Sequence, residues 1–334
     1  MKSYQPYILG HGMAGKAFAK ALSILAVQEA DLRFESPIFL ARGELATLKL
    51  KNPDSSLLAI TNPSGLHARA ILEGERAGFP NIFVEKPACT SLEELRSLAG
   101  VRARVAVLHV YREMWGPNYL RELVKSGRLG TIFALESRYW QPTAAHRAVS
   151  GEASRSSWKN SPELSGGVDA LLDLGSHWID LISFVSASRP RTLTTRMLYA
   201  LAEAPHRDTH VQFDMILENG AAVQGSVSKV VHGSGNDLEV VLLGTQGTAR
   251  WNFMNPDQVI LGSGRDASLI TRKGGECGST HAPYHALGWM EGYISIVRKA
   301  LRGEAEASDA DLRLPRLQEN LGLLELLISA SSKG

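Results

Sequence analysis

Apolar runs and helical periods alternate through the first third of the chain. Short apolar runs predict strands, and stretches with a period near 3.6 predict helices. The predicted strands are 4–9, 37–41, 57–60, 81–84 and 104–110, and the predicted helices are 16–26, 67–77 and 91–99. Alternating strands and helices are typical of a parallel, doubly wound sheet. We therefore expect residues 1–110 to form one α/β domain. The stretch between Arg42 and Leu57 is too short for a further helix and strand, so one helix–strand unit should be trimmed.

The rest of the chain changes to a pattern dominated by strands. The predicted strands are 130–140, 192–201, 209–217, 221–231, 237–244, 247–253 and 258–261, and the predicted helices include 117–126, 284–302 and 314–330. Short turns between these strands favour an antiparallel sheet. Residues 111–334 are therefore expected to form a second α/β domain with a large, mostly antiparallel sheet.

One further helix, expected from about Gly167 onward, carries an unusual polar stripe. Asp169, Asp173, Ser176, His177 and Asp180 fall within roughly 100° of arc at 100° per residue. An amphipathic surface helix with a solvated face would give such a stripe. That face would normally carry Lys, Glu or Arg, and residues 165–188 contain none of them. We interpret the stripe as the inner face of a buried helix, where Asp173 and His177 are neighbours four residues apart.

The first predicted strand leads into a glycine motif. Gly10-His11-Gly12-Met13-Ala14-Gly15 has the spacing GxGxxG and is followed directly by a helix. In that context the first glycine permits a tight turn, the second lets a pyrophosphate approach, and the third allows close helix–strand packing. The expected dinucleotide contacts at this turn are Gly10, Gly12, Met13, Ala14 and Gly15.

The end of the second predicted strand bears on the choice of nucleotide. An NAD site usually has Asp or Glu there, whereas this chain has Ala41 and then Arg42. An arginine without the acid suits a 2′-phosphate, so NADP(H) is favoured over NAD(H). In the alternative, Arg42 stacks on the adenine of NAD and Glu44 takes the ribose.

The later strand ends should line the same cofactor. Thr61, Asn62 and Pro63 follow one strand, with His67 in the first turn of the next helix as a cofactor-edge contact or a capping residue. Glu85 and Lys86 follow the next strand and precede Pro87, which fixes φ and turns the chain out of the sheet. An ordinary charged loop is the alternative for this pair.

Composition narrows the class of partner. The chain has 334 residues, 44% hydrophobic and 21% charged, with a net charge of +2. This balance predicts neither a nucleic-acid nor a membrane partner. The start of the chain lacks the features of a signal peptide, and a cytoplasmic location is expected. The two cysteines, Cys89 and Cys277, form neither a disulfide framework nor a metal-spacing motif, so no metal is expected.

The order and separation of three motifs support a specific resemblance. The glycine turn, Glu85-Lys86-Pro87 and the Gly166-Gly167…Asp173…His177…Asp180 helix occur as they do in the glucose–fructose oxidoreductase / inositol dehydrogenase (Gfo/Idh/MocA) family, which the chain resembles over nearly its full length. The resemblance implies a Rossmann domain followed by a domain whose open sheet face builds homodimers or homotetramers. It also implies hydride transfer between nicotinamide and a sugar, cyclitol or related alcohol, with Lys86, Asp173 and His177 as catalytic residues.

This chemistry agrees with the residue types. Alcohol oxidation needs a base, for which His177 is oriented by Asp173, and a cation such as Lys86 that stabilises the developing alkoxide. The expected substrate contacts are Tyr111, Arg112, Trp158, Lys159, Asp173 and His177. Two alternatives remain: a glycosidase that retains its NAD and oxidises the sugar transiently, and a non-catalytic nucleotide-dependent sensor.

Overall fold

The computed structural model describes residues 2–150, 158, 161–201, 206–273, 287–302 and 315–331. The chain divides into two compact units. The first unit comprises 1–110, 161–166 and 287–324, and the second comprises 111–160, 167–286 and 325–334. The chain first leaves the first unit after Val110, at the expected boundary. Residues 287–324, expected in the second domain, belong instead to the first unit.

The first unit is built on a parallel sheet. Its strands are β1 (Lys2–Leu9), β2 (Leu32–Phe34), β3 (Ile38–Leu40), β4 (Ser56–Ile60), β5 (Asn81–Val84) and β6 (Arg104–Val107). They run in the order β2-β1-β4-β5-β6, and β3 extends the edge that β2 begins by pairing with the second half of β1. Every residue of β4 and β5 is buried, which explains their continuous apolar pattern. The short edge strand β2 was not predicted.

The helices of the first unit connect and cover these strands. They are α1 (Met13–Gln28), α2 (Glu44–Thr47), α3 (His67–Arg76), α4 (Leu92–Leu98), α7 (Pro162–Ser165), α10 (Met290–Arg302) and the first half of α11 (Leu317–Ser331). Between β3 and β4 the chain forms only the single turn α2 and a 3-10 turn at Pro53–Ser55. The predicted trimming of the Rossmann half is therefore confirmed.

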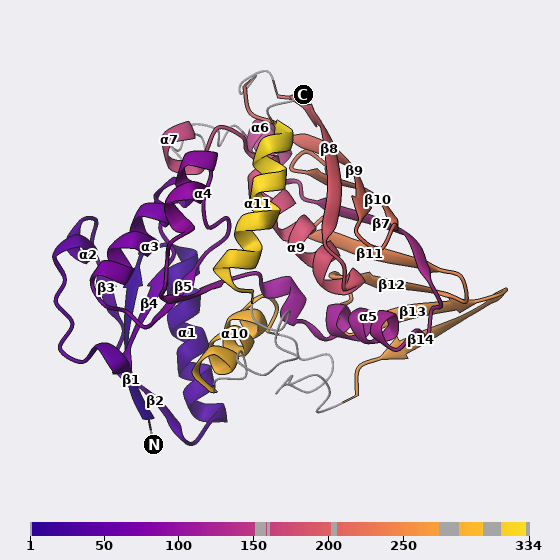
Figure 1. The fold of residues 1–334 in the computed structure, drawn as a ribbon. Helices are drawn as coiled ribbons and strands as arrows, with labels where there is room; N and C mark the ends of the chain where they lie inside the picture. The colour runs from indigo at the N-terminus through magenta and orange to yellow at the C-terminus, as the bar shows by residue number, and fades with distance from the viewer. Residues whose placement is uncertain are drawn as a thin grey trace. The chain divides into compact units, whose positions relative to one another are not determined.

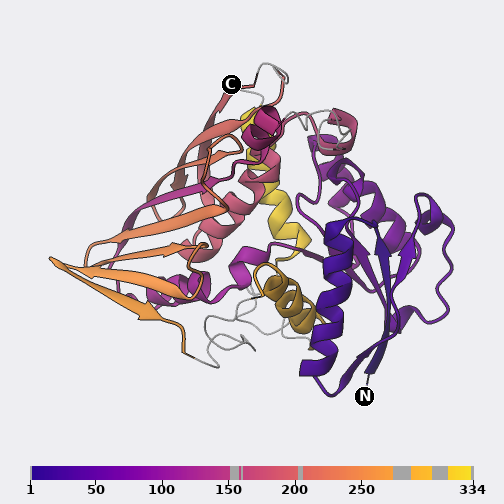
Figure 2. The same cartoon turned by 180° about the vertical axis from the view of Figure 1, so that it is seen from behind.

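Helix α10, which is late in the sequence, packs in the first unit. It lies beside α1, as Figures 1 and 2 show from opposite sides. The Phe18 and Tyr293 rings are 5.7 Å apart, and Arg298 Nε lies 2.7 Å from a Glu29 carboxylate oxygen. These contacts explain why this late segment belongs to the first unit.

The second unit is built on an eight-stranded sheet. Its strands are β7 (Ile132–Trp140), β8 (Pro190–Leu198), β9 (His210–Leu217), β10 (Ala222–Ser228), β11 (Asp237–Gly244), β12 (Thr248–Asn252), β13 (Gln258–Ser263) and β14 (Asp266–Thr271). The order is β14-β13-β12-β11-β7-β10-β9-β8. All neighbours are antiparallel except β7 and β10, so the mostly antiparallel sheet is confirmed. The largely exposed edge strand β14 was not predicted.

Helices of the second unit include α5 (Trp115–Lys125), α6 (Thr143–Ser150), α8 (Ala170–Asp173) and α9 (Gly175–Ser186). Helix α6 follows β7 and was not predicted. Every residue of α9 is buried, so the helix is an internal one, and a solvated polar face is excluded. Trp178 stacks on Phe213 at 4.3 Å, and its ring lies so close to Gly225 that a Cβ there would be 2.6 Å away. Helix α9 thus lies inside the second unit, beside the eight-stranded sheet (Figure 1).

Candidate functional site

The glycine turn has the geometry of a pyrophosphate cradle. Gly10 has φ of +119°, and a Cβ there would lie 2.7 Å from Thr61. A Cβ on Gly15 would lie 2.2 Å from the Gly10 carbonyl oxygen, whereas one on Gly12 would meet nothing within 4 Å. Gly12 is the N-cap of α1, and no side chain caps this end. The open side at Gly12 and the uncapped helix N-terminus fit a bound phosphate group.

The loop after β3 bears on the two expected arrangements: Arg42 binding a 2′-phosphate, or Arg42 stacking on adenine while Glu44 takes the ribose. A Glu44 carboxylate oxygen accepts a hydrogen bond of 2.6 Å from the Ala41 backbone N–H. This contact, together with Gly43 at φ +90°, turns the loop back on itself. Arg42 is exposed, and no carboxylate pairs with it among the residues described. The acid that could take a ribose is therefore engaged by its own loop, while the guanidinium remains available.

His67 joins the two loops that follow β4 and β5. Its Nδ1 lies 2.7 Å from the Pro87 carbonyl oxygen and its Nε2 lies 2.8 Å from that of Asn62. Burial lowers the pKa of His67, outweighing the two carbonyl contacts that raise it. Because both ring nitrogens contact backbone, His67 acts as an internal clamp, which differs from the expected cofactor-edge contact. Asn62 Oδ1 is buried without a hydrogen-bond partner in the described part of the chain, as a ligand-facing group can be.

Glu85 and Lys86 differ in their surroundings. The Tyr293 hydroxyl of α10 donates a hydrogen bond to the Glu85 carboxylate. Burial is the main cause that raises the pKa of Tyr293, and this carboxylate raises it further. Glu85 thus has an internal structural partner, which the sequence did not predict. Lys86 is half-buried and stands at the carboxyl edge of β5, as expected, with the Glu85 N–H bonded to Ile60 O at 2.9 Å.

In the second unit, α8 and α9 keep Asp173 and His177 on one helical face. Leu174 lies between the two helices in α-helical conformation, and the bonds Leu174 N to Ala170 O and Trp178 N to Leu174 O are both 3.0 Å. The helical ladder therefore runs through the junction. Asp173 is partly exposed and His177 is buried, with 8% of its surface accessible.

Two tyrosines line the imidazole of His177. The ring centroids of Tyr111 and Tyr139 lie 4.9 Å and 6.2 Å from it, both edge-on. Their hydroxyl oxygens are 2.7 Å apart, and Asn236 and Gln141 each donate to one of them at 3.0 Å. Burial and the Tyr111 hydroxyl raise the pKa of Tyr139 well above its ordinary value. Tyr111 thus belongs to a polar cluster with His177, and Tyr139, Asn236 and Gln141 are members that sequence reasoning missed.

A buried lysine binds the acids of the stripe, and sequence reasoning missed it as well. Lys229 Nζ lies 2.5 Å from Asp169 Oδ1 and 2.7 Å from Asp173 Oδ2, with only 2% of its side chain exposed. Burial alone would lower the pKa of Lys229, but the two carboxylates together raise it. The sequence places Lys229 directly after β10, where a lone lysine is typical of a solvated strand end. No sequence signal distinguishes it from one.

Arg112 has a partner that argues against the expected substrate contact. Its Nε donates to Asp180 Oδ2 at 2.9 Å, and a second nitrogen pairs with Oδ1. The side chains are 4% and 2% exposed, so the Arg112 charge is already neutralised inside the unit. Trp158 is 38% exposed. Lys159 lies outside the described residues.

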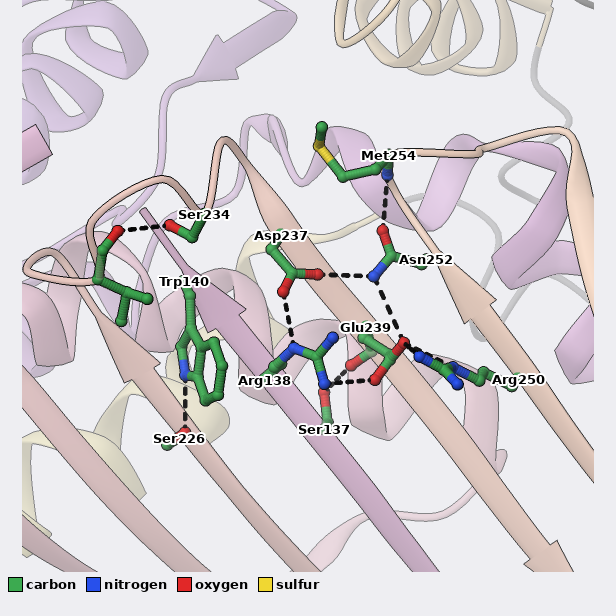
Figure 3. A network of polar contacts seen from close by, with 11 residues as sticks. Ser137, Arg138, Trp140, Ser226, Ser234, Asp237, Glu239, Arg250, Asn252 and Met254 are labelled. Atoms are coloured by element: carbon green, nitrogen blue, oxygen red, sulfur yellow. Dashed lines mark hydrogen bonds and ion pairs between the residues drawn. The ribbon is translucent and has the colours of Figure 1, made fainter. Parts of the chain in front are cut away.

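Helices of the described residues cover one face of the eight-stranded sheet, and an ion network lies on the other (Figure 3). Arg138 Nε is 2.7 Å from Asp237 Oδ2, and its Nη1 is 2.6 Å from Glu239 Oε1. Arg250 joins Glu239 from β12, and Trp140 donates to Ser226 at 2.9 Å. Arg138 and its neighbour Tyr139 therefore serve opposite faces, as alternation along a strand requires.

Comparison with known proteins agrees with this architecture. The GFO/IDH/MocA C-terminal domain matches residues 118–250. The uncharacterized oxidoreductase YrbE of Bacillus subtilis is 27% identical over 221 residues, and the levoglucosan dehydrogenase of Pseudarthrobacter phenanthrenivorans is 23% identical over 235. Each alignment covers 63% of this chain but only 59% and 58% of those relatives, respectively.

Solved structures share the fold over the whole chain. An inositol dehydrogenase homolog from Azotobacter vinelandii, complexed with NAD+, superposes with a TM-score of 0.83 at 18% identity, covering 100% of this chain and 96% of that one. The chain thus shares a fold in which one unit is built on a parallel sheet and the other on a mostly antiparallel sheet. Residues 118–250 thus match the GFO/IDH/MocA C-terminal domain, and the whole chain is similar in fold to the inositol dehydrogenase homolog. No helix in the described residues has the length and apolarity to cross a membrane.

Proposed function

We propose that this protein is an NAD(P)-dependent oxidoreductase that transfers hydride between nicotinamide and a CH–OH carbon of a sugar, cyclitol or sugar derivative. The observation that carries the proposal is the buried polar face of α8 and α9. It sets Asp173 and His177 among hydroxyl and amide groups inside the second unit. The names of relatives that act on levoglucosan and inositol support the substrate class.

The roles of the residues follow from their chemistry. Bound nicotinamide supplies the hydride acceptor or donor. His177 takes the proton of the substrate hydroxyl, and Asp173 holds the imidazole in position for this transfer. Lys86 stabilises negative charge on the substrate oxygen. The phenol of Tyr139 stays protonated, and the hydroxyl groups of Tyr111 and Tyr139 orient the polar groups around His177.

NADP(H) is the proposed cofactor. The support comes from the loop after β3, where Glu44 is bound to Ala41 N–H and Arg42 is exposed without a carboxylate partner among the described residues. A free guanidinium is suited to the bidentate binding of a phosphate. The Azotobacter vinelandii neighbour is complexed with NAD+, so this chain would differ from it in nucleotide preference.

The sheet face with the ion network is the proposed surface for a homodimer or homotetramer. Polar and aromatic side chains alternate there, including Arg138, Trp140 and Arg250 (Figure 3). Interfaces are enriched in Trp and Arg. Arg138 stacks on Trp140 at 5.0 Å, which gives this face a rigid aromatic centre.

One experiment tests the activity. The purified protein is titrated with NADPH, NADH and their oxidised forms by fluorescence, and sugars and cyclitols are then screened by nicotinamide absorbance. Tight NADPH binding and alcohol-dependent reduction of NADP+ are expected. A nucleotide that remains bound while sugar is released from a glycoside, with no net reduction, would indicate the cofactor-retaining glycosidase. Failure to bind any nicotinamide nucleotide would refute the proposal.

A further inference from the structure

Lys229 stands where two acids of one helix would otherwise repel each other. Asp169 is the N-cap of α8 and Asp173 its last residue, so the two carboxylates lie four residues apart on one face. Lys229 Nζ contacts both, at 2.5 Å and 2.7 Å. Like charges at this spacing destabilise a helix unless a cation compensates them.

The backbone of Lys229 is fixed from two sides. Its N–H donates to Thr209 O at 2.8 Å, and its carbonyl accepts from Ala144 N at 2.9 Å and Ala145 N at 3.2 Å. The side chain therefore starts from a rigid junction of β9, β10 and α6. A lysine held in this way determines where the Asp173 carboxylate lies.

Further charged and titratable groups face the same two acids. Arg207 lies 3.7 Å from Asp169. The Asp208 carboxylate accepts from the backbone N–H groups of Asp169 and Leu171, and burial raises its pKa. The negative charge of Asp173 contributes to the raised pKa of Tyr139, and His177 lies one helical turn after Asp173. Lys229 Nζ contacts both Asp169 and Asp173 through ion pairs, at 2.5 Å and 2.7 Å.

We propose that Lys229 is a positioning residue for the hydride-transfer site: it holds Asp173 ionised and in place, and through Asp173 it orients His177. This role rests on the proposed function. The sequence motifs assign only Asp173, His177 and Lys86 to this site. The proposal adds Lys229, which directly follows β10. Substrate chemistry does not pass through Lys229, because its buried Nζ contacts two carboxylates inside the unit.

The test compares K229M, K229R and the double variant D169N/K229M by their pH profiles of kcat and kcat/KM. K229M removes the cation that compensates the negative charges of Asp169 and Asp173, which lie four residues apart. We expect kcat to fall about 10²-fold with KM nearly unchanged, and the acidic limb of the profile to move to higher pH. K229R should restore most of kcat and the original limb.

The double variant D169N/K229M controls for a folding defect in K229M, because it removes the negative charge of Asp169 together with the cation. R128M is the control, because Arg128 is an exposed cation of the same unit that lies between α5 and β7. Its pH profile should equal that of the wild type. Wild-type kcat and pH profile in K229M would overturn the positioning role.

A second readout separates this proposal from the proposed function. Carboxyl carbon NMR of the full chain follows the titration of Asp173, assigned with D173N. In K229M the Asp173 signal should titrate at higher pH than in the wild type. If the wild type oxidises no alcohol, the proposed function fails on its own. An Asp173 titration that is identical in both proteins overturns the role of Lys229.

Discussion

The hydroxyl oxygens of Tyr111 and Tyr139 lie 2.7 Å apart, and both rings stand edge-on to the imidazole of His177. Tyr111 opens the second unit, and Tyr139 lies near the end of β7, so the pair joins two parts of the unit at the proposed base. The raised pKa of Tyr139 keeps its phenol protonated at neutral pH. Tyr139 can therefore donate a hydrogen bond but is unsuited to the role of base, for which His177 is the proposed residue.

The contrast between the Tyr139 phenol and the His177 imidazole gives a direct test of His177 as the base. H177A should lower kcat by about 10²- to 10⁴-fold, the usual contribution of a general base. Y139F removes a hydroxyl from the same cluster but leaves the imidazole, so its loss should be smaller and its pH profile unchanged. Steady-state kinetics and a nucleotide titration check both variants, and nucleotide affinity should remain at the wild-type value. If H177A turned over as fast as Y139F, His177 would not be the base.

Nucleotide preference should depend on Arg42. R42A is expected to weaken NADPH binding by about 10- to 100-fold, since a hydrogen bond to a charged group contributes about 1.5–3 kcal/mol. NADH binding should change little, because NADH lacks the 2′-phosphate. R33A is the control: Arg33 is also exposed but pairs with Ser3, in the first half of β1, away from the glycine turn. Equal losses for NADPH and NADH in R42A would contradict the NADP assignment.

Alanine substitutions of two glycines in the same motif should affect different properties, stability at Gly15 and nucleotide binding at Gly12. G15A places a Cβ 2.2 Å from the Gly10 carbonyl oxygen, so it should reduce the free energy of unfolding by about 1–3 kcal/mol. G12A meets nothing within 4 Å and should fold normally, yet it should weaken nucleotide binding by blocking the approach of the pyrophosphate. Denaturant unfolding and nucleotide titration measure the two effects. Normal nucleotide binding by G12A would argue against the cradle.

Arg112 is expected to matter for folding. R112M breaks a buried ion pair and leaves Asp180 uncompensated, which should cost about 3–5 kcal/mol of unfolding free energy. The double variant R112M/D180L removes both charges and should recover much of that loss. Chemical denaturation of the three proteins tests this. A fully stable R112M with a raised KM would instead support the substrate contact that the sequence suggested.

Acid should destabilise the first unit through His67. Its pKa is lowered in the folded protein, chiefly by burial, so the unfolded chain binds a proton that the folded protein resists. Stability is therefore lost as the pH falls below the ordinary histidine value of about 6.5, and none is lost above it. H67Q should flatten the decline of unfolding free energy between about pH 7 and pH 5. His210, whose pKa burial also lowers, should contribute in the same direction, and H210Q provides the comparison. An unchanged slope in H67Q would refute this assignment.

The sequence predicted those parts of the site that depend on local patterns. The GxGxxG turn, the Lys86 edge position and the buried α8–α9 helix can be read from spacing, because each depends on neighbours within one turn or one strand. Lys229 could not be read in this way, since its partners Asp169 and Asp173 are distant in sequence. The ion pair of Arg112 with Asp180 could not be predicted for the same reason, because nothing near Arg112 in sequence indicates this partner. The edge strands β2 and β14 were missed because short or exposed strands lack a strong apolar pattern.

The return of α10 to α1 has a consequence for how the protein is made. The first unit is complete only when residues 287–324 have been synthesised, because Tyr293 and Arg298 supply the contacts to Phe18 and Glu29. During translation the unit that carries the glycine turn therefore lacks one of its helices until residues 287–324 have been synthesised. A fragment ending at residue 110 would carry the glycine turn but lack the helix that covers α1, and it should be prone to aggregation.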